Sequence, residues 1–196
     1  MEKDCKECAK EKATIVFADE AGIQMAGNVK RTWAPCGETP IIQQVTRSYR
    51  KVSAMGAIAV TPAGRRVRGF FRLLENQNFN TDACIAFLEQ LKQNIKGNIT
   101  LVWDRLLAHK SKKMLSYLDR QTRLKVHYLP AYAPELNPVE YMWSYLKSNP
   151  MANRSHFDSS SLKVKAKAAM CEIRTDSDLL KSFIKHSPLG RAIRLY

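Results

Sequence analysis

No stretch of this 196-residue chain approaches the ~18 consecutive apolar residues of a membrane span, and its polar N-terminus has no apolar core of a signal peptide. A disulfide framework is also missing, because the five cysteines are odd in number and irregular in spacing. Cys5 and Cys8 form a C-x-x-C pair, but no second Cys or His pair stands at a matching distance, so we interpret this spacing as chance. These absences favour a protein of a reducing cytoplasm with no membrane partner.

Acidic residues are scarce: 18 Asp and Glu stand against 32 Lys and Arg, which gives a formal net charge of +14. This excess favours a polyanionic partner, because each neutralised phosphate of a nucleic acid releases a condensed counterion. A basic surface that is merely solvated is the alternative, since charge marks a footprint and not a site. With 45% hydrophobic and 26% charged residues, the composition fits one globular domain, with or without a short appendage.

The pattern of apolar residues predicts strands first, and then strands and helices in alternation. A strand over 14–19 is expected to end at the turn signal Glu20-Ala21-Gly22, and a second strand over 30–34 at Pro35. The later elements are a hairpin of strands 52–60 and 65–73, a helix from 81 to about 96, a strand over 99–104, a helix over 111–120, a strand over 124–129, a helix after Asn137 and two or three short basic helices over 158–194. This order predicts a mixed α/β sheet flanked by helices.

We divide the chain into a flexible lead-in over residues 1–12, an α/β domain over 13–150, and C-terminal basic helices over 151–196 that pack on this domain or extend it. The strands over 14–19 and 99–104 are almost continuously apolar, as is typical of central strands covered on both faces. If these strands are neighbours, the acids that end them meet in one region of the sheet.

Three carboxylates stand out by their surroundings. Asp19 and Asp104 close apolar strands, and Glu140 opens a helix. Two acids at strand ends and a third on a following helix suit divalent metal ions that act on phosphate. Asp19 also has a plain structural explanation, because aspartate is common at turns. If the strand instead continues, Glu20 is expected to point away from Asp19.

Glu140 has a structural alternative of its own. It falls at the third position of a helix that Asn137 caps and Pro138 begins, so helix capping explains it without catalysis. The core-facing stripe of this helix consists of Val139, Met142, Trp143 and Leu146. Glu140 borders the stripe on the same side as Lys147, from which it can face the acids of the sheet. The two roles are compatible, because a rigid first turn holds a metal ligand well.

Four motifs occur in a fixed order. They span Phe17 to Gly22, Arg31 to Gly37, Val102 to Ser111, and Leu129 to Lys147. Over roughly residues 14–150 they resemble the catalytic domain of mariner-like bacterial transposases, the insertion sequence 630 family. The resemblance implies a ribonuclease-H-like fold with a mixed five-stranded sheet flanked by helices. By motif, the DDE triad of catalytic and metal-binding acids consists of Asp19, Asp104 and Glu140.

The resemblance also implies an activity and its requirements. Two Mg²⁺ or Mn²⁺ ions support nicking at transposon ends, after which the freed 3′-hydroxyl attacks double-stranded target DNA, typically at TA sites. It implies a homodimer on DNA and a bacterial, nucleoid-associated location. Because about a dozen residues precede the first strand, we expect a separate helix-turn-helix polypeptide to read the transposon ends. Two alternatives are a ribonuclease-H-like nuclease without strand transfer and an inactive remnant that only binds DNA.

Basic residues near the motifs are candidates for DNA contact: Arg65, Arg66, Arg68, Arg72, Arg105, His109, Lys110 and Lys147. For the four arginines of the hairpin, a solvated face is the alternative. Arg105 stands where the family usually has Asn or Gly, so it either grips phosphate or crowds the metal. A histidine in this position is most often a surface or packing residue; the functional alternative is that His109 touches substrate phosphate or orients a water molecule.

Overall fold

The computed structural model describes residues 13–41, 50–62, 64, 66–191 and 193, so the lead-in with Cys5 and Cys8, and also Arg65, lie outside it. The strands are β1 (Thr14–Gln24), β2 (Lys51–Val60), β3 (Val67–Glu75), β4 (Ile99–Trp103) and β5 (Leu124–Tyr128). The α-helices are α2 (Thr81–Asn94), α3 (Lys112–Asp119), α4 (Pro138–Ser148), α5 (Ser159–Thr175) and α6 (Ser177–His186). Three short 3-10 helices are η1 (Leu107–Lys110), η2 (Pro134–Leu136) and η3 (Pro188–Arg191).

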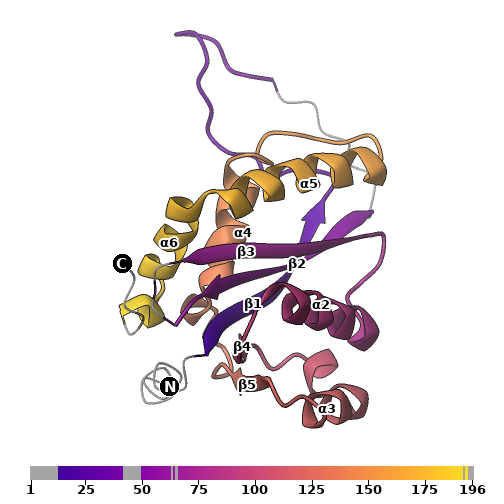
Figure 1. Cartoon of the computed structure of the whole chain (residues 1–196). Coiled ribbons are helices and arrows are strands. Elements are labelled where there is room, and N and C mark those ends of the chain that lie inside the picture. Colours follow the sequence, from indigo (N-terminus) through magenta and orange to yellow (C-terminus); the bar gives the residue numbers. More distant parts are fainter. Residues whose placement is uncertain (1–12, 42–49, 63, 65, 192, 194–196) are drawn as a thin grey trace.

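The five strands form one mixed sheet in the order β3-β2-β1-β4-β5 (Figure 1). β1, β4 and β5 are parallel, whereas β2 runs antiparallel to both β1 and β3. The predicted five-stranded mixed sheet and the 52–60 hairpin are therefore confirmed. β1 and β4 are direct parallel neighbours, and β4 ends at Trp103 beside the middle of β1, which continues to Gln24.

Helices cover both faces of the sheet, and Figure 1 shows α2 and α3 on one side and α4, α5 and α6 on the other. One hydrophobic core lies between the sheet and α2 with α3, and a larger core lies under α4, α5 and α6. Both faces of β1 and β4 are buried, which explains their nearly continuous apolar sequences. Among the helices of the described ranges, none is long and apolar enough to cross a membrane.

Two predicted features in the first part of the chain are wrong. β1 does not end at Glu20-Ala21-Gly22 but continues to Gln24, because β2 pairs with it through Gln24↔Lys51. The segment 30–34 forms no strand; it is exposed, and Trp33 is 99% accessible. Its alternation of basic and apolar residues is compatible with a strand, but within the described ranges no partner strand lies beside it.

Helix α4 begins as the sequence predicts. The Asn137 side chain accepts a hydrogen bond from the Val139 N–H, and Pro138 occupies the first turn. The same side chain also donates to the carbonyl oxygen of Ala18 in β1, at 3.0 Å. Asn137 is buried, so one amide both caps α4 and ties its N-terminus to the strand residue that precedes Asp19.

We expect Asn137→Ala to lower the free energy of unfolding by about 2–3 kcal/mol, because a buried cap and a buried carbonyl lose their partners together. Asn149→Ala is the matched control, since Asn149 lies exposed at the other end of α4 and should change stability by less than about 0.5 kcal/mol. Urea unfolding of both variants measures the difference. Equal effects would contradict the role of Asn137 as a tie between α4 and β1.

Candidate active site and metal centre

Asp19 and Asp104 lie side by side at the point where β4 ends next to the middle of β1. The parallel pairing of β1 with β4 places Phe17 opposite Val102, and each acid follows two residues later. Carboxylate oxygens of Asp19, Glu20 and Asp104 all lie within 4.8 Å of one another. The sequence-based expectation that these two strands are neighbours is confirmed, and the acids converge as a result.

Glu20 belongs to this acidic group, which was not foreseen from the sequence. Along a continuing strand, Glu20 was expected to point away from Asp19 and so to miss the site. Instead, Asp104 lies just beyond the end of β4, where its carboxylate is close to both neighbours. The side chains of Asp19 and Glu20 therefore point to opposite faces of the strand, but a carboxylate oxygen of Glu20 still belongs to the acidic cluster.

Glu140 approaches the acids from the first turn of α4. Burial raises its pKa, the nearby Lys147 ammonium lowers it, and the Asp104 carboxylate raises it. Its own negative charge in turn raises the pKa of Asp19. Glu140 is not part of the group whose oxygens lie within 4.8 Å of one another, but it is near enough for its charge to act on both aspartates.

Asp19 is the most perturbed acid of the site. It is only 7% exposed, and burial together with the charges of Glu140, Glu20 and Asp104 raises its pKa to about 8. A hydrogen bond from Trp143 opposes this rise in the pKa. Several carboxylates held together without a cation raise one another's pKa in this way, and a divalent metal reverses the effect.

Metal binding at these acids should therefore release a proton near neutral pH. Below pH 8 the Asp19 carboxyl group carries a proton that Mn²⁺ must displace, so the apparent affinity should fall by up to about tenfold per pH unit from pH 8 to 6, and level off above pH 8. Calorimetric titrations in two buffers of different ionisation enthalpy measure the Mn²⁺ affinity and the number of protons released on binding. Asp19→Asn should bind Mn²⁺ weakly and without this proton release; equal wild-type affinities at pH 6 and 8 would contradict the prediction.

His109 lies beneath the acids and does not face solvent. Its ring is 0% exposed and stacks on Trp103 at 3.4 Å between ring centroids. Nε2 of His109 lies 2.9 Å from Glu20 Oε1. Nδ1 lies 2.7 Å from Asp104 Oδ1; this second contact is an ion pair whose geometry is not aligned for a hydrogen bond. Burial lowers the pKa of His109, but the contacts with Asp104, Cys84 and Glu20 outweigh it and raise the pKa to about 11.

The prediction that His109 touches substrate phosphate is therefore wrong for the described arrangement. A buried ring between two carboxylates cannot reach DNA, but it can hold Glu20 and Asp104 in position. The sequence offered one signal that could have found this role: His109 follows Asp104 by five residues, close enough for the chain to fold back onto it. The partner Glu20 is 89 residues away in sequence and could not have been found from spacing.

Trp143 was identified from the sequence only as part of the apolar stripe of α4. Its indole Nε1–H donates to Asp19 Oδ2 at 2.9 Å, and both groups are buried. Gly56 in β2 lies opposite Asp19 in the antiparallel register. A Cβ atom at Gly56 would lie 2.7 Å from the Trp143 ring, so the missing side chain leaves the space in which the indole reaches Asp19.

The predicted DNA-contacting arginines of the hairpin do not gather at the acids. In the sheet register, Arg72 of β3 pairs with Met55 of β2, and Met55 pairs with Glu20 of β1. Arg68 lies four residues farther along β3 from the acids. Arg68 also donates to the Asn94 carbonyl at the end of α2. Arg66 is exposed at the hairpin end, away from the acids. Of the described hairpin arginines, only Arg72 is level with the acidic cluster.

Arg105 and Lys110 lie closer to the acids. Both are exposed; Arg105 directly follows Asp104, and Lys110 directly follows His109. Arg105 Nε donates to the Leu129 carbonyl oxygen at 3.0 Å, which fixes its stem on the segment after β5. Lys110 lies over the Tyr128 ring. Positive charge is therefore present at the rim of the site.

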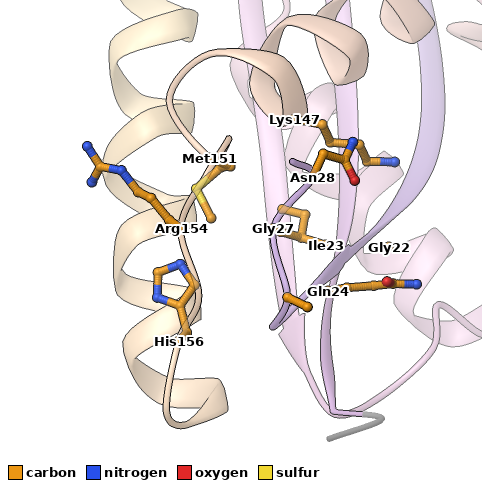
Figure 2. Close-up of a pocket in the computed structure, with 10 residues that line it drawn as sticks. Gly22, Ile23, Gln24, Gly27, Asn28, Lys147, Met151, Arg154 and His156 are labelled. Carbon is orange, nitrogen blue, oxygen red and sulfur yellow. The ribbon is translucent and has the colours of Figure 1, made fainter. Parts of the chain in front are cut away.

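Lys147 lines a cavity of about 180 Å³ that lies between the C-terminal end of β1 and the loop after α4. Figure 2 shows Lys147, Asn28 and Gln24 on one side of this cavity and Met151, Arg154 and His156 on the other. The loop is held by backbone hydrogen bonds from Gly27 to Arg154 and from His156 to Met25. The cavity adjoins the acids through α4, since Lys147 lies two turns after Glu140.

A mixed five-stranded sheet with one acid within the central strand β1, a second just after the parallel strand β4 and a third on a following helix has the arrangement of a ribonuclease-H-like catalytic domain. The family profile described as "DDE superfamily endonuclease" matches residues 14–163, and the chain belongs to this family. The resemblance to mariner-like transposase domains, proposed from the four motifs, is thereby confirmed at the level of family and fold.

Individual relatives agree with this assignment. The "Insertion element IS630 uncharacterized 39 kDa protein" of Shigella sonnei is 35% identical over 78 residues, which cover 39% of this chain and 22% of that protein. The fold is similar to the Mos1 transposase paired-end complex with left transposon end, with a TM-score of 0.65 at 14% identity. It is also similar to the Mos1 mariner paired end complex with Mn, with a TM-score of 0.65 at 16% identity. The chain is covered completely in both comparisons but spans 62% of each Mos1 chain.

Proposed function

We propose that this chain is the catalytic domain of a DDE transposase, which nicks DNA at the ends of a mobile element and joins the ends to target DNA. The observation that carries the proposal is the convergence of Asp19, within β1, and Asp104, just after the parallel strand β4, with Glu140 on the adjoining helix. The family to which the chain belongs supports an endonuclease. Strand transfer is supported by the fold shared with the Mos1 complexes.

The acidic cluster fits a centre for Mg²⁺ or Mn²⁺. Its ligands are carboxylate oxygens, which these hard cations prefer. The pKa of Asp19 is raised by burial and by the neighbouring carboxylates. Glu20 Oε2 is buried and has no hydrogen-bond partner among the described residues. Both observations indicate a negative charge that a cation would balance. Asp19, Asp104 and Glu140 would hold the ions, and Glu20 is available as a fourth acid. When bound, a pair of such ions supplies a more acidic water and stabilises the charge that develops on the phosphate.

The chain's own residues then have distinct roles. Trp143 orients Asp19 through its indole N–H, and His109 keeps Asp104 and Glu20 in place from below. Arg105 and Lys110 at the rim, and Lys147 beside Glu140, offer positive charge to the DNA backbone. Because both orienting side chains are buried, the acids are held by rigid neighbours before DNA arrives.

The substrate class follows from the same argument. We infer that double-stranded DNA is bound as transposon ends and as target, with TA as the preferred target step because it deforms easily. Two ends must be held together for joining, which supports a homodimer on DNA. A DNA-acting bacterial enzyme of this kind belongs with the nucleoid in the cytoplasm.

Plasmid nicking and end joining test the proposal. The purified chain is incubated with supercoiled plasmid and a labelled duplex ending in a free 3′-hydroxyl, with Mn²⁺, with Mg²⁺, or with a chelator. Metal-dependent nicks together with labelled plasmid are the expected products. Nicks without labelled plasmid would indicate a nuclease that joins nothing. DNA binding with neither product, at saturating metal, would overturn the enzymatic proposal in favour of a DNA-binding remnant.

A further inference from the structure

A second group of metal-ligating side chains lies next to the acids, on the α2 side of the sheet. It consists of Glu20 from β1, Cys84 from α2 and His109 from η1, whose ligand atoms all lie within 4.8 Å of one another. Cys84 and His109 are completely buried. Thiol and imidazole ligands set this group apart from the all-carboxylate centre, because soft ligands select zinc over Mg²⁺ and Mn²⁺.

The distances approach those of a tetrahedral zinc site. His109 Nε2 lies 2.9 Å from Glu20 Oε1, and Cys84 Sγ lies 3.8 Å from the same oxygen. With Zn–N and Zn–O of ~2.0 Å and Zn–S of ~2.3 Å, tetrahedral angles require about 3.3 Å between N and O and about 3.5 Å between S and O. Each observed separation differs from its target by less than about half an ångström, so small side-chain rotations are sufficient.

The surroundings also match a metal-bound histidine. Such a histidine usually presents its second ring nitrogen to a carboxylate, which fixes the ring. In this protein Nδ1 of His109 lies 2.7 Å from Asp104 Oδ1, while Nε2 lies 2.9 Å from Glu20 Oε1. Glu20 Oε2 is buried and has no hydrogen-bond partner in the part of the chain that the structure describes. An open cavity of about 210 Å³ is lined by Glu20 and His109, so two of the three ligand residues border a space that can hold a water molecule as the fourth ligand.

We propose that Glu20, Cys84 and His109 form a binding site for a thiophilic divalent cation, Zn²⁺, separate from the Asp19–Asp104–Glu140 centre. Coordination uses the thiolate of Cys84 and the neutral ring of His109, so the thiol and imidazolium protons pass to solvent. The remaining ring proton, on Nδ1, then faces Asp104, which connects the zinc site to the catalytic centre through one side chain. The proposal does not depend on the proposed function, because it concerns binding alone.

Cobalt substitution tests the site, because Co²⁺ occupies zinc sites and a thiolate ligand gives it an intense near-ultraviolet charge-transfer band. The protein is the full chain with Cys5, Cys8 and Cys36 changed to Ser, so that the remaining cysteines are Cys84 and Cys171. Titration with Co²⁺ is carried out under reducing conditions with saturating Mg²⁺ to occupy the carboxylates. We expect a band that saturates at one equivalent and disappears when one equivalent of Zn²⁺ is added.

The variants assign the band to its ligands. Cys84→Ala should abolish the charge-transfer band. It should also weaken Zn²⁺ binding by more than about 100-fold, because loss of a residue that merely supports a metal ligand already costs up to about 100-fold. Cys171→Ser, on the half-buried outer side of α5, should keep the band. Asp19→Asn should also keep the band while losing Mg²⁺-dependent nicking, which separates this inference from the proposed function. No band in the Cys84-containing protein, or a band that survives Cys84→Ala, would overturn the proposal.

Discussion

Asp104→Asn is expected to reduce Mn²⁺-dependent plasmid nicking by at least about 1,000-fold. A carboxylate oxygen of Asp104 lies within 4.8 Å of those of Asp19 and Glu20, and the charge of Asp104 also acts on Glu140. Loss of one preorganised electrostatic group in an active site typically reduces the rate by 10²–10³. Loss of a metal ligand is expected to reach the upper end of that range or exceed it, because the cation loses affinity as well as position.

The control for this variant is Asp178→Asn. Asp178 lies in the first turn of α6 with a side chain that is 94% exposed, so its loss should leave nicking within twofold of the wild type. Both variants should unfold cooperatively in urea. Nicking by folded Asp104→Asn at a rate close to that of the wild type would remove Asp104 from the triad. The same measurement on Asp19→Asn and Glu140→Gln assigns the other two acids.

Much of the fold could be predicted because its signals are local. The caps at Asn80, Ser111 and Asn137 begin the helices that follow them, as their positions indicated. The buried runs over Ile99–Trp103 and the hairpin over 52–73 also needed only neighbouring residues. The missed extension of β1 past Glu20 has a different origin. Pairing with Lys51–Val60 overrides the turn preference of Ala21-Gly22, and such pairing lies outside any local window.

The site divides in the same way. Asp19, Asp104 and Glu140 each carry a local motif, so the sequence could propose them. Glu20, Trp143 and Gly56 gain their roles only from contacts across the sheet: Trp143 reaches Asp19 across 124 residues, and Gly56 faces Asp19 through β-sheet register. A tryptophan on an apolar helix stripe is most simply explained by packing, and its indole N–H gives no signal until a buried acceptor is located.

Gly56→Ala is expected to lower the free energy of unfolding by about 1–3 kcal/mol, the usual cost of overpacking a filled core. The added Cβ would lie 2.5 Å from Met142 Cε and 2.7 Å from the Trp143 ring. Met142 can move because its side chain is flexible, but the indole is held by its bond to Asp19. The variant should therefore displace the indole and weaken Mn²⁺ binding as well as stability.

A double-mutant cycle with Trp143→Phe separates these effects. Trp143→Phe alone should destabilise the fold, because buried Asp19 loses its donor, and should weaken Mn²⁺ binding by about 10–100-fold, as loss of an outer-shell partner does. In the background of the Trp143→Phe variant the ring atoms that meet the new Cβ are gone, so Gly56→Ala should cost less than about 0.5 kcal/mol. Urea unfolding of the four proteins gives the coupling, expected at about 1–2 kcal/mol. Strict additivity of the two substitutions would mean that Gly56 does not make room for Trp143. Coupling in both stability and Mn²⁺ affinity would show that Gly56 and Trp143 act together to position Asp19.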